Sequence, residues 1–288
     1  MSDNPQRAQP VFFALGGGVV ELAGPDATRF AQAQTMNDVA ALAAGRWQWN
    51  GWLTPKGRLV ALFALLKFDD ARLWLWLPDA DAGDFAERLR RFVFRSKLAV
   101  AARADLHVAG AFGSPARARG AGFAGDADAG VELDLSAEGG ARLLRIATTE
   151  AAEDAAALAR WRRQDLAHGL PRLDPAQQEQ WTPQMLSLDR LRAYSVKKGC
   201  YPGQEIVART HFLGQAKRGL ALLHADAPLA AGADVAGADR TLGPVVSVAE
   251  DDDATLALAV LPVEREGVAL RAGEAALREQ PLLDGLAR

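Results

Sequence analysis

Short apolar segments, separated by glycine, proline and aspartate, recur along this 288-residue chain and limit it to folds that are rich in strands. Two longer segments, residues 79–92 and 151–166, space their apolar residues as helices do. The strands predicted between residues 11 and 215 are 46–52, 59–68, 73–77, 98–102, 106–109, 131–135 and 143–147. Because helices and strands are mixed along this part of the chain, we expect the α+β class.

Three consecutive glycines, residues 16–18, separate two short apolar segments, 11–13 and 19–22. A third glycine and a helix do not follow at the spacing of a nucleotide-binding loop. Glycine runs favour tight turns, so we interpret this run as the turn of a hairpin. The polar residues 1–10 are predicted to form a disordered arm.

The pattern changes after Gln215, where short strands are interrupted by glycine, proline and aspartate. These strands are residues 220–223, 245–249, 256–261 and 268–270. Such spacing is typical of a small antiparallel barrel or sandwich. We therefore predict two regions, 11–215 and a C-terminal β-barrel domain at 216–288.

The chain contains one cysteine, Cys200, which excludes an intramolecular disulfide and a metal site made of cysteines alone. A chain without disulfides suits a reducing compartment. No apolar run reaches the roughly 18–20 residues that a membrane-spanning helix needs, and the first residues lack the apolar core of a signal peptide. We therefore expect a cytoplasmic protein with no membrane partner.

The stretch around Cys200 has the features of a reactive thiol. Lys197 and Lys198 precede it, and Gly199 leaves it open to approach. Pro202 suits the first position of a helix, which would point free N–H groups toward the sulfur. These positive groups favour the thiolate form of Cys200. The alternative is a buried structural cysteine beside a turn, which is common for free cysteines.

The run K-G-C-Y-x-G-Q-E at residues 198–205, followed by V-A-R, resembles the signature of the YgfZ family of folate-binding proteins. That family is related to the glycine-cleavage T-protein, an aminomethyltransferase. The motif residues are Lys198, Gly199, Cys200, Tyr201, Gly203, Gln204, Glu205 and Arg209. The resemblance extends to residues 181–186 and 217–218, and more faintly to 32–39. It implies an aminomethyltransferase-like fold, in which three modules surround a central folate pocket and residues 11–215 form two interleaved α+β modules.

The resemblance also implies a function. It indicates a protein that binds tetrahydrofolate or a related reduced folate and acts in the assembly or repair of iron–sulfur clusters. The affected enzymes include tRNA-modifying ones, and the partners are iron–sulfur proteins or assembly factors. Cys200 would be the working thiol, together with Lys198. One cysteine cannot hold a cluster alone, because four ligands are normally needed.

The same comparison identifies Trp161 as the folate-contacting residue. A second contacting tryptophan would fall near Gly17, where no aromatic residue stands. The glutamate that T-proteins direct at the pterin is also missing, because the corresponding residues 167–169 are Ala-His-Gly. Asp165 is a candidate to replace this glutamate.

Two other functions remain as alternatives. The first is a folate-dependent aminomethyl transferase, but the expected acidic pair is replaced by Val60, Ala61 and Leu62, so its general acid is missing. The second is an RNA-binding module, which the net charge of −3 and the lack of an RNA-binding motif argue against. Arginine-rich segments at 88–97 and 160–163 are interpreted as solvated helix faces, or as a patch for phosphates or the folate tail. The four histidines lack ligand spacing, so no metal site is expected.

Overall fold

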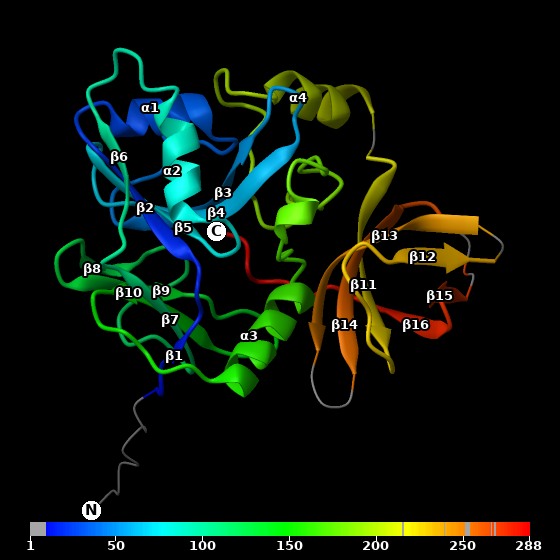
Figure 1. Cartoon of the computed structure of the whole chain (residues 1–288). Coiled ribbons are helices and arrows are strands. Elements are labelled where there is room, and N and C mark those ends of the chain that lie inside the picture. Colours follow the sequence, from blue (N-terminus) through cyan, green and yellow to red (C-terminus); the bar gives the residue numbers. More distant parts are fainter. Residues whose placement is uncertain (1–9, 215, 239, 251–253, 266, 268) are drawn as a thin grey trace, which may run out of the picture.

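The computed structural model describes residues 10–288 except 215, 239, 251–253, 266 and 268 (Figure 1). The predicted arm at residues 1–10 lies outside the described residues, apart from Pro10. The described part contains two open sheets, in which the order of the strands differs from their order along the chain, one closed barrel and four α-helices. This confirms the α+β class. None of the described helices has the length and hydrophobicity to cross a membrane.

The first sheet is antiparallel and has the strand order β3-β4-β5-β2-β6. Its strands are β2 (Gly18–Ala23), β3 (Arg46–Leu53), β4 (Leu59–Lys67), β5 (Arg72–Leu77) and β6 (Ala99–Ala102). Helices α1 (Ala27–Gln34) and α2 (Ala82–Arg90) cover one face, where Phe30 and Phe85 pack with Phe63. The opposite face carries Trp47 and Trp49, which join a larger apolar cluster. Since both faces are covered, every residue of β4 is buried.

The second sheet has the order β1-β7-β10-β9-β8 and carries helix α3 (Ala155–Ala167). Its strands are β1 (Phe13–Ala14), β7 (His107–Phe112), β8 (Ala124–Asp126), β9 (Gly130–Asp134) and β10 (Arg142–Ala147). The predicted hairpin of 131–135 and 143–147 is present as the antiparallel pair β9 and β10. Asp154 caps α3, where its carboxylate accepts a hydrogen bond from the backbone of Ala157.

The hairpin predicted around glycines 16–18 is wrong. β1 pairs with β7 in the second sheet, whereas β2 pairs with β5 and β6 in the first. The glycines therefore carry the chain from one sheet to the other. Gly17 has a φ of 76°, and a Cβ there would lie 2.4 Å from the carbonyl oxygen of Leu77, so the crossing requires glycine. The chain enters the second sheet, forms the whole first sheet, and then returns.

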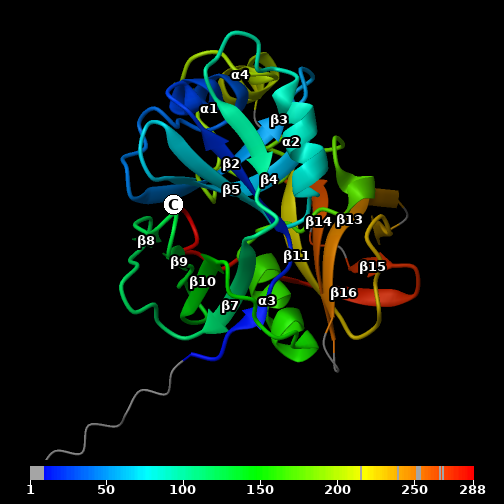
Figure 2. The same cartoon turned by 60° about the vertical axis from the view of Figure 1, so that its left-hand side comes forward.

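The C-terminal strands form a closed antiparallel barrel, which confirms the predicted barrel and excludes the sandwich. In chain order they are β11 (Arg218–Ala225), β12 (Asp234–Gly237), β13 (Arg240–Glu250), β14 (Thr255–Pro262), β15 (Leu270–Ala272) and β16 (Ala275–Gln280). Residue 268 of the predicted strand 268–270 lies outside the described residues. The division into regions 11–215 and 216–288 stays a prediction. The eight residues after β16 leave the barrel and run between the two open sheets (Figure 2).

The largest apolar cluster, here called the central cluster, joins these parts. It contains side chains of both open sheets, with Leu170 and Leu186 from the irregular segment that follows α3 and Leu286 from the last eight residues. That irregular segment includes the short 3-10 helix η1 (Pro175–Gln177) and leads to helix α4 (Gln204–Leu213). The central cluster therefore fixes the segment that carries Cys200 relative to both sheets.

Candidate functional site

Cys200 lies exposed in the loop that precedes α4. A Cβ added at Gly199 would meet no atom within 4 Å, so the approach to the sulfur is open on that side. The alternative of a buried structural cysteine is therefore wrong. The thiol reactivity itself stays a prediction.

The start of α4 is set by glycine packing rather than by Pro202, which lies in the turn before the helix. Gly203 caps the helix with a φ of 78°, and a Cβ there would lie 2.6 Å from Cα of Gly57 and 2.7 Å from the carbonyl oxygen of Thr54. The prediction that the helix begins at Pro202 is thus two residues early. The loop of Cys200 packs against the turn between β3 and β4, and only glycine permits this close approach.

Lys198 anchors this loop to the end of α1 and to the residues that follow it. Its side chain is buried, and its Nζ donates to the carbonyl oxygens of Gln32 and Thr35 at 2.5 Å and of Asn37 at 3.0 Å. Burial lowers the pKa of Lys198 to about 8, although nearby Asp38 opposes this shift. An ammonium has three N–H donors, and all three have partners. Lys198 therefore holds the loop at the C-terminal end of α1 and has no donor left for a thiolate.

The other motif residues divide into two groups. Tyr201 and Gln204 support the loop: the Tyr201 hydroxyl donates to the carbonyl oxygen of Ser195 at 3.3 Å, and the Gln204 amide donates to that of Lys198 at 3.2 Å. Burial raises the pKa of Tyr201 to about 12, so its hydroxyl remains a donor near neutral pH. Glu205 and Arg209 are exposed on α4, the helix that follows the exposed Cys200. The motif thus combines buried anchors with a surface that a partner can reach.

Asn37 completes the anchor, and the sequence reasoning missed it. Its backbone N–H donates to Oδ1 of Asn50 at 2.9 Å, and its side-chain amide donates to the carbonyl oxygens of Trp49 at 2.8 Å and Arg192 at 2.7 Å. The faint resemblance at residues 32–39 was the available signal. These bonds fix the backbone of Asn37, whose carbonyl oxygen accepts a hydrogen bond from Lys198.

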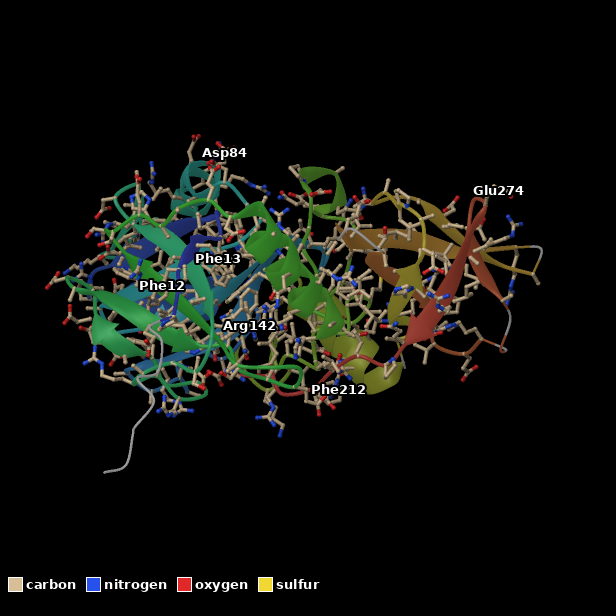
Figure 3. All side chains as sticks on the ribbon, turned by 90° about the horizontal axis from the view of Figure 1, so that it is seen from below. Phe12, Phe13, Asp84, Arg142, Phe212 and Glu274 are labelled. Carbon is tan, nitrogen blue, oxygen red and sulfur yellow. The ribbon has the colours of Figure 1, made fainter. Side chains whose placement is uncertain are left out.

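Trp161 lies on α3 and is fully buried. Its ring packs against Phe13 and Phe112 with ring centroids 6.0 Å apart, and the guanidinium of Arg142 lies 4.6 Å from its centre. A Cβ at Gly110 would approach the ring to 2.9 Å, so glycine makes room for it. The indole N–H has no hydrogen-bond partner among the described residues. Figure 3 shows Arg142 and Phe13 in the interior, whereas Phe212 of α4 projects outward.

Asp165, the candidate replacement for the pterin-binding glutamate, is bound by two arginines. One carboxylate oxygen accepts from Arg142 at 2.7 Å and the other from Arg172 at 3.2 Å. Arg172 also binds Asp79 at 2.7 Å, and burial raises the pKa of Asp79. This buried network joins α3 to β10 and to the turn after β5. Asp165 therefore serves packing, and its oxygens are not free for a ligand.

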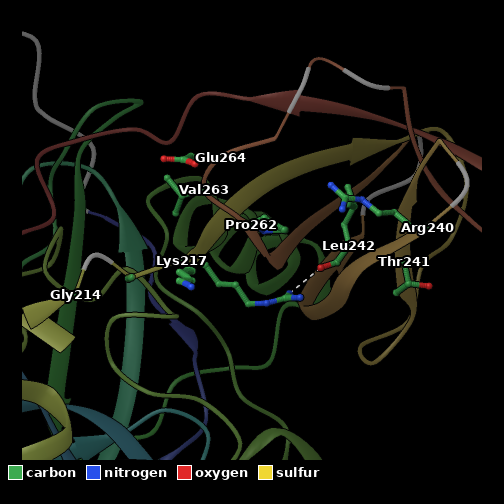
Figure 4. Close-up of a pocket in the computed structure, with 10 residues that line it drawn as sticks. Gly214, Lys217, Arg240, Thr241, Leu242, Pro262, Val263 and Glu264 are labelled. Atoms are coloured by element: carbon green, nitrogen blue, oxygen red, sulfur yellow. Dashed lines mark hydrogen bonds between the residues drawn. The ribbon is translucent and has the colours of Figure 1, made fainter. Parts of the chain in front are cut away.

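A basic cavity of about 630 Å³ lies where the chain passes from α4 into the barrel (Figure 4). Lys217, Arg218 and Arg240 contribute its positive charge, and Glu264 its negative charge. Arg218 donates to the carbonyl oxygen of Leu242 at 2.7 Å, so its side chain helps to close the barrel rim. The resemblance at residues 217–218 thus falls on a structural contact of the barrel.

No family model matches the sequence. The sequence is 32% identical over 224 residues to the tRNA-modifying protein YgfZ of Serratia proteamaculans, an alignment that covers 70% of this chain and 67% of that protein. The YgfZ protein of Vibrio vulnificus strain YJ016 is 28% identical over 274 residues, with 86% and 83% covered. An uncharacterized protein of Haemophilus influenzae is 27% identical over 210 residues, with 70% and 69% covered.

The fold is similar to the crystal structure of the glycine cleavage system aminomethyltransferase T from Bartonella henselae. The TM-score is 0.74, at 16% identity, and the likeness covers 97% of this chain and 86% of that one. This confirms the predicted aminomethyltransferase-like fold. The 32% identity to the Serratia protein shows that this chain belongs to the YgfZ family.

Proposed function

We propose that this protein is a cytoplasmic, folate-binding accessory protein that acts in the assembly or repair of iron–sulfur clusters. The enzymes that depend on it include tRNA-modifying ones, and Cys200 is its working thiol. Membership of the YgfZ family supports the role in tRNA modification, since its relatives carry that name. The observation that carries the proposal is the exposed thiol on a loop that buried motif residues hold in place.

The geometry limits what Cys200 does. One thiolate supplies one of the four ligands that a cluster normally needs, so the sulfur acts at an interface where a partner supplies the others. Glu205 and Arg209 are exposed on the helix that follows this loop, four residues apart and so on one helix face, and offer charges for such a partner. Iron–sulfur proteins or their assembly factors fit this requirement.

Tetrahydrofolate or a related reduced folate would bind between the two open sheets, near Trp161. Two buried donors support the fit: Nη2 of Arg142 and the indole N–H of Trp161 both lack partners among the described residues. The pterin ring offers a carbonyl oxygen and ring nitrogens that accept such hydrogen bonds. A reduced folate carries one-carbon units on its N5 and N10 nitrogens. The chain's part would be to enclose and orient the ring.

The test is complementation of a bacterial strain that lacks its own YgfZ protein. The wild-type chain should restore the product of an iron–sulfur tRNA-modifying enzyme, measured as modified nucleoside in digested tRNA. Cys200→Ser should fail to restore it although the protein accumulates and folds. Glu274→Gln, an exposed change at a barrel turn, is the control. Full activity of Cys200→Ser would refute the role of the thiol, and absence of saturable folate binding would refute the cofactor.

A further inference from the structure

Residues 281–288 follow the last barrel strand and leave the barrel. They have no regular secondary structure, yet they run between the two open sheets, where the C-terminal end lies in the middle of the molecule (Figures 1 and 2). Leu286 is 2% exposed and belongs to the central cluster. This segment, here called the tail, therefore fills space beside the proposed folate site.

The first half of the tail is held by the second sheet module. The Leu283 N–H donates to the carbonyl oxygen of Ala167 at 2.8 Å, and the Asp284 N–H donates to Glu138 Oε2 at 2.8 Å. Gly285 then turns the chain with a φ of 93°, against Ala137. The anchored part thus ends at a glycine that can serve as a hinge.

The second half contacts the face of the first sheet that carries Trp47 and Trp49. The indole N–H of Trp49 donates to the carbonyl oxygen of Leu286 at 2.9 Å. The guanidinium of Arg288 lies 5.5 Å from the centre of the Trp47 ring. It donates to the carbonyl oxygens of Asp134 at 3.0 Å and Ser136 at 3.0 Å. A flat group with N–H donors in its plane thus lies over an indole and binds two main-chain carbonyls.

The position of Arg288 is costly for a cation. Each hydrogen bond of its guanidinium to the described residues goes to a main-chain carbonyl, and none goes to a carboxylate. Burial lowers the pKa of Arg288; the nearby carboxylate of Asp134 opposes this shift, and the nearby cation Arg142 adds to it by a smaller amount. A neutral ring with the same donors would use the same acceptors without burying a charge. Arg142 in turn contacts Trp161, so the position adjoins the proposed folate site.

The 2-amino-4-oxo edge of a pterin is a cyclic acylguanidine, so it presents a flat face and in-plane N–H donors as Arg288 does. We propose that the face of Trp47 and the carbonyls of Asp134 and Ser136 form the subsite for the pterin ring. Arg288 occupies this subsite in the free protein, and a folate binds by displacing residues 286–288 about Gly285. This inference rests on the folate binding proposed above and adds the place of the ring and the group that it must displace.

The first test is the affinity for 5-formyltetrahydrofolate, a stable reduced folate, measured by calorimetry. Arg288→Ala and a chain that ends at Asp284 should bind more tightly than the wild type, and Arg278→Ala in the barrel should not. If the tail is docked in about nine of ten molecules, its removal lowers the apparent Kd about tenfold. Weaker binding by Arg288→Ala would overturn the proposal, because Arg288 would then be part of the site.

The second test uses the wild-type 288-residue chain, so it does not depend on how the variants fold. Carboxypeptidase B removes a C-terminal arginine, and mass spectrometry follows the loss of Arg288. The folate should accelerate this loss, whereas p-aminobenzoylglutamate, which lacks the pterin ring, should not. An unchanged rate, with equal affinities of wild type and Arg288→Ala, would overturn the proposal and leave folate binding intact. No saturable binding by any chain would instead refute folate binding itself.

Discussion

Replacing Lys198 by methionine tests the anchor of the Cys200 loop. Methionine keeps the unbranched apolar part of the side chain and removes the ammonium that binds the carbonyls of Gln32, Thr35 and Asn37. The three carbonyls then lose their buried donor, and the loop loses its link to α1. We therefore expect Lys198→Met to destabilise the fold and to loosen the loop.

The size of the effect is the difference between two terms. Without the amino group, three buried carbonyl oxygens have no donor, at a cost of about 1–3 kcal/mol each. Lowering the pKa of Lys198 from 10.5 to about 8 corresponds to a burial cost of about 3 kcal/mol for the ammonium, at about 1.4 kcal/mol per pKa unit, and methionine does not carry this cost. The first term exceeds the second, so we expect the free energy of unfolding to fall by about 2–5 kcal/mol.

The assay is urea unfolding followed by tryptophan fluorescence, with Lys197→Met as the matched control. Lys197 is the exposed neighbour, and its replacement should change the free energy of unfolding by less than about 0.5 kcal/mol. If Lys198→Met were as stable as Lys197→Met, the carbonyl contacts would not hold the loop and the reasoning would be wrong.

Three further predictions follow from the same structure. Because folding lowers the pKa of Lys198, the unfolded chain binds more protons between pH 8 and 10.5. The stability of wild type relative to Lys198→Met should therefore rise with pH in this window, and a fall would contradict the lowered pKa. Cys200 should react with one equivalent of a thiol reagent in the native chain without denaturant, whereas a thiol that reacts only in urea would contradict its exposure. Asp165→Asn leaves two buried guanidinium groups without their shared carboxylate, so urea unfolding should show a loss of about 3–5 kcal/mol, and a loss as small as that of the exposed control Glu153→Gln would refute the structural role of the network.

The sequence predicted those elements that local patterns determine. The apolar runs of β3, β4 and β5 and the helical spacing of α2 and α3 were placed within a few residues, because burial imposes a regular pattern on each segment. Glycines 16–18 show the limit of such patterns. A glycine run permits a turn, but it does not specify which strands pair, and the partner of β1 lies 95 or more residues away in β7.

The candidate site was predictable to the same extent. The motif identified Cys200, and Gly199 correctly indicated an open approach to it. The role of Lys198 was not predictable, because its acceptors lie on a segment more than 160 residues earlier in the chain. The beginning of α4 was placed too early for a similar reason, since the contact of Gly203 with Gly57 exists only in the folded protein. The tail has no periodicity and was assigned to the barrel region by its place in the sequence.

One continuous set of contacts joins the loop of Cys200 to the tail. Lys198 binds the carbonyl oxygen of Asn37, and the side chain of Asn37 binds that of Trp49. The indole of Trp49 binds the carbonyl oxygen of Leu286. These hydrogen bonds span 161, 12 and 237 residues of sequence, and each links its segment to the next. Strand β3 carries Trp47 and Trp49, and its backbone accepts the hydrogen bond from Asn37. The proposed pterin subsite and the anchor of the thiol therefore share one strand. The interleaved path of the chain places them there: the strand belongs to the first sheet, the tail arrives from the barrel, and the loop comes from the segment after α3.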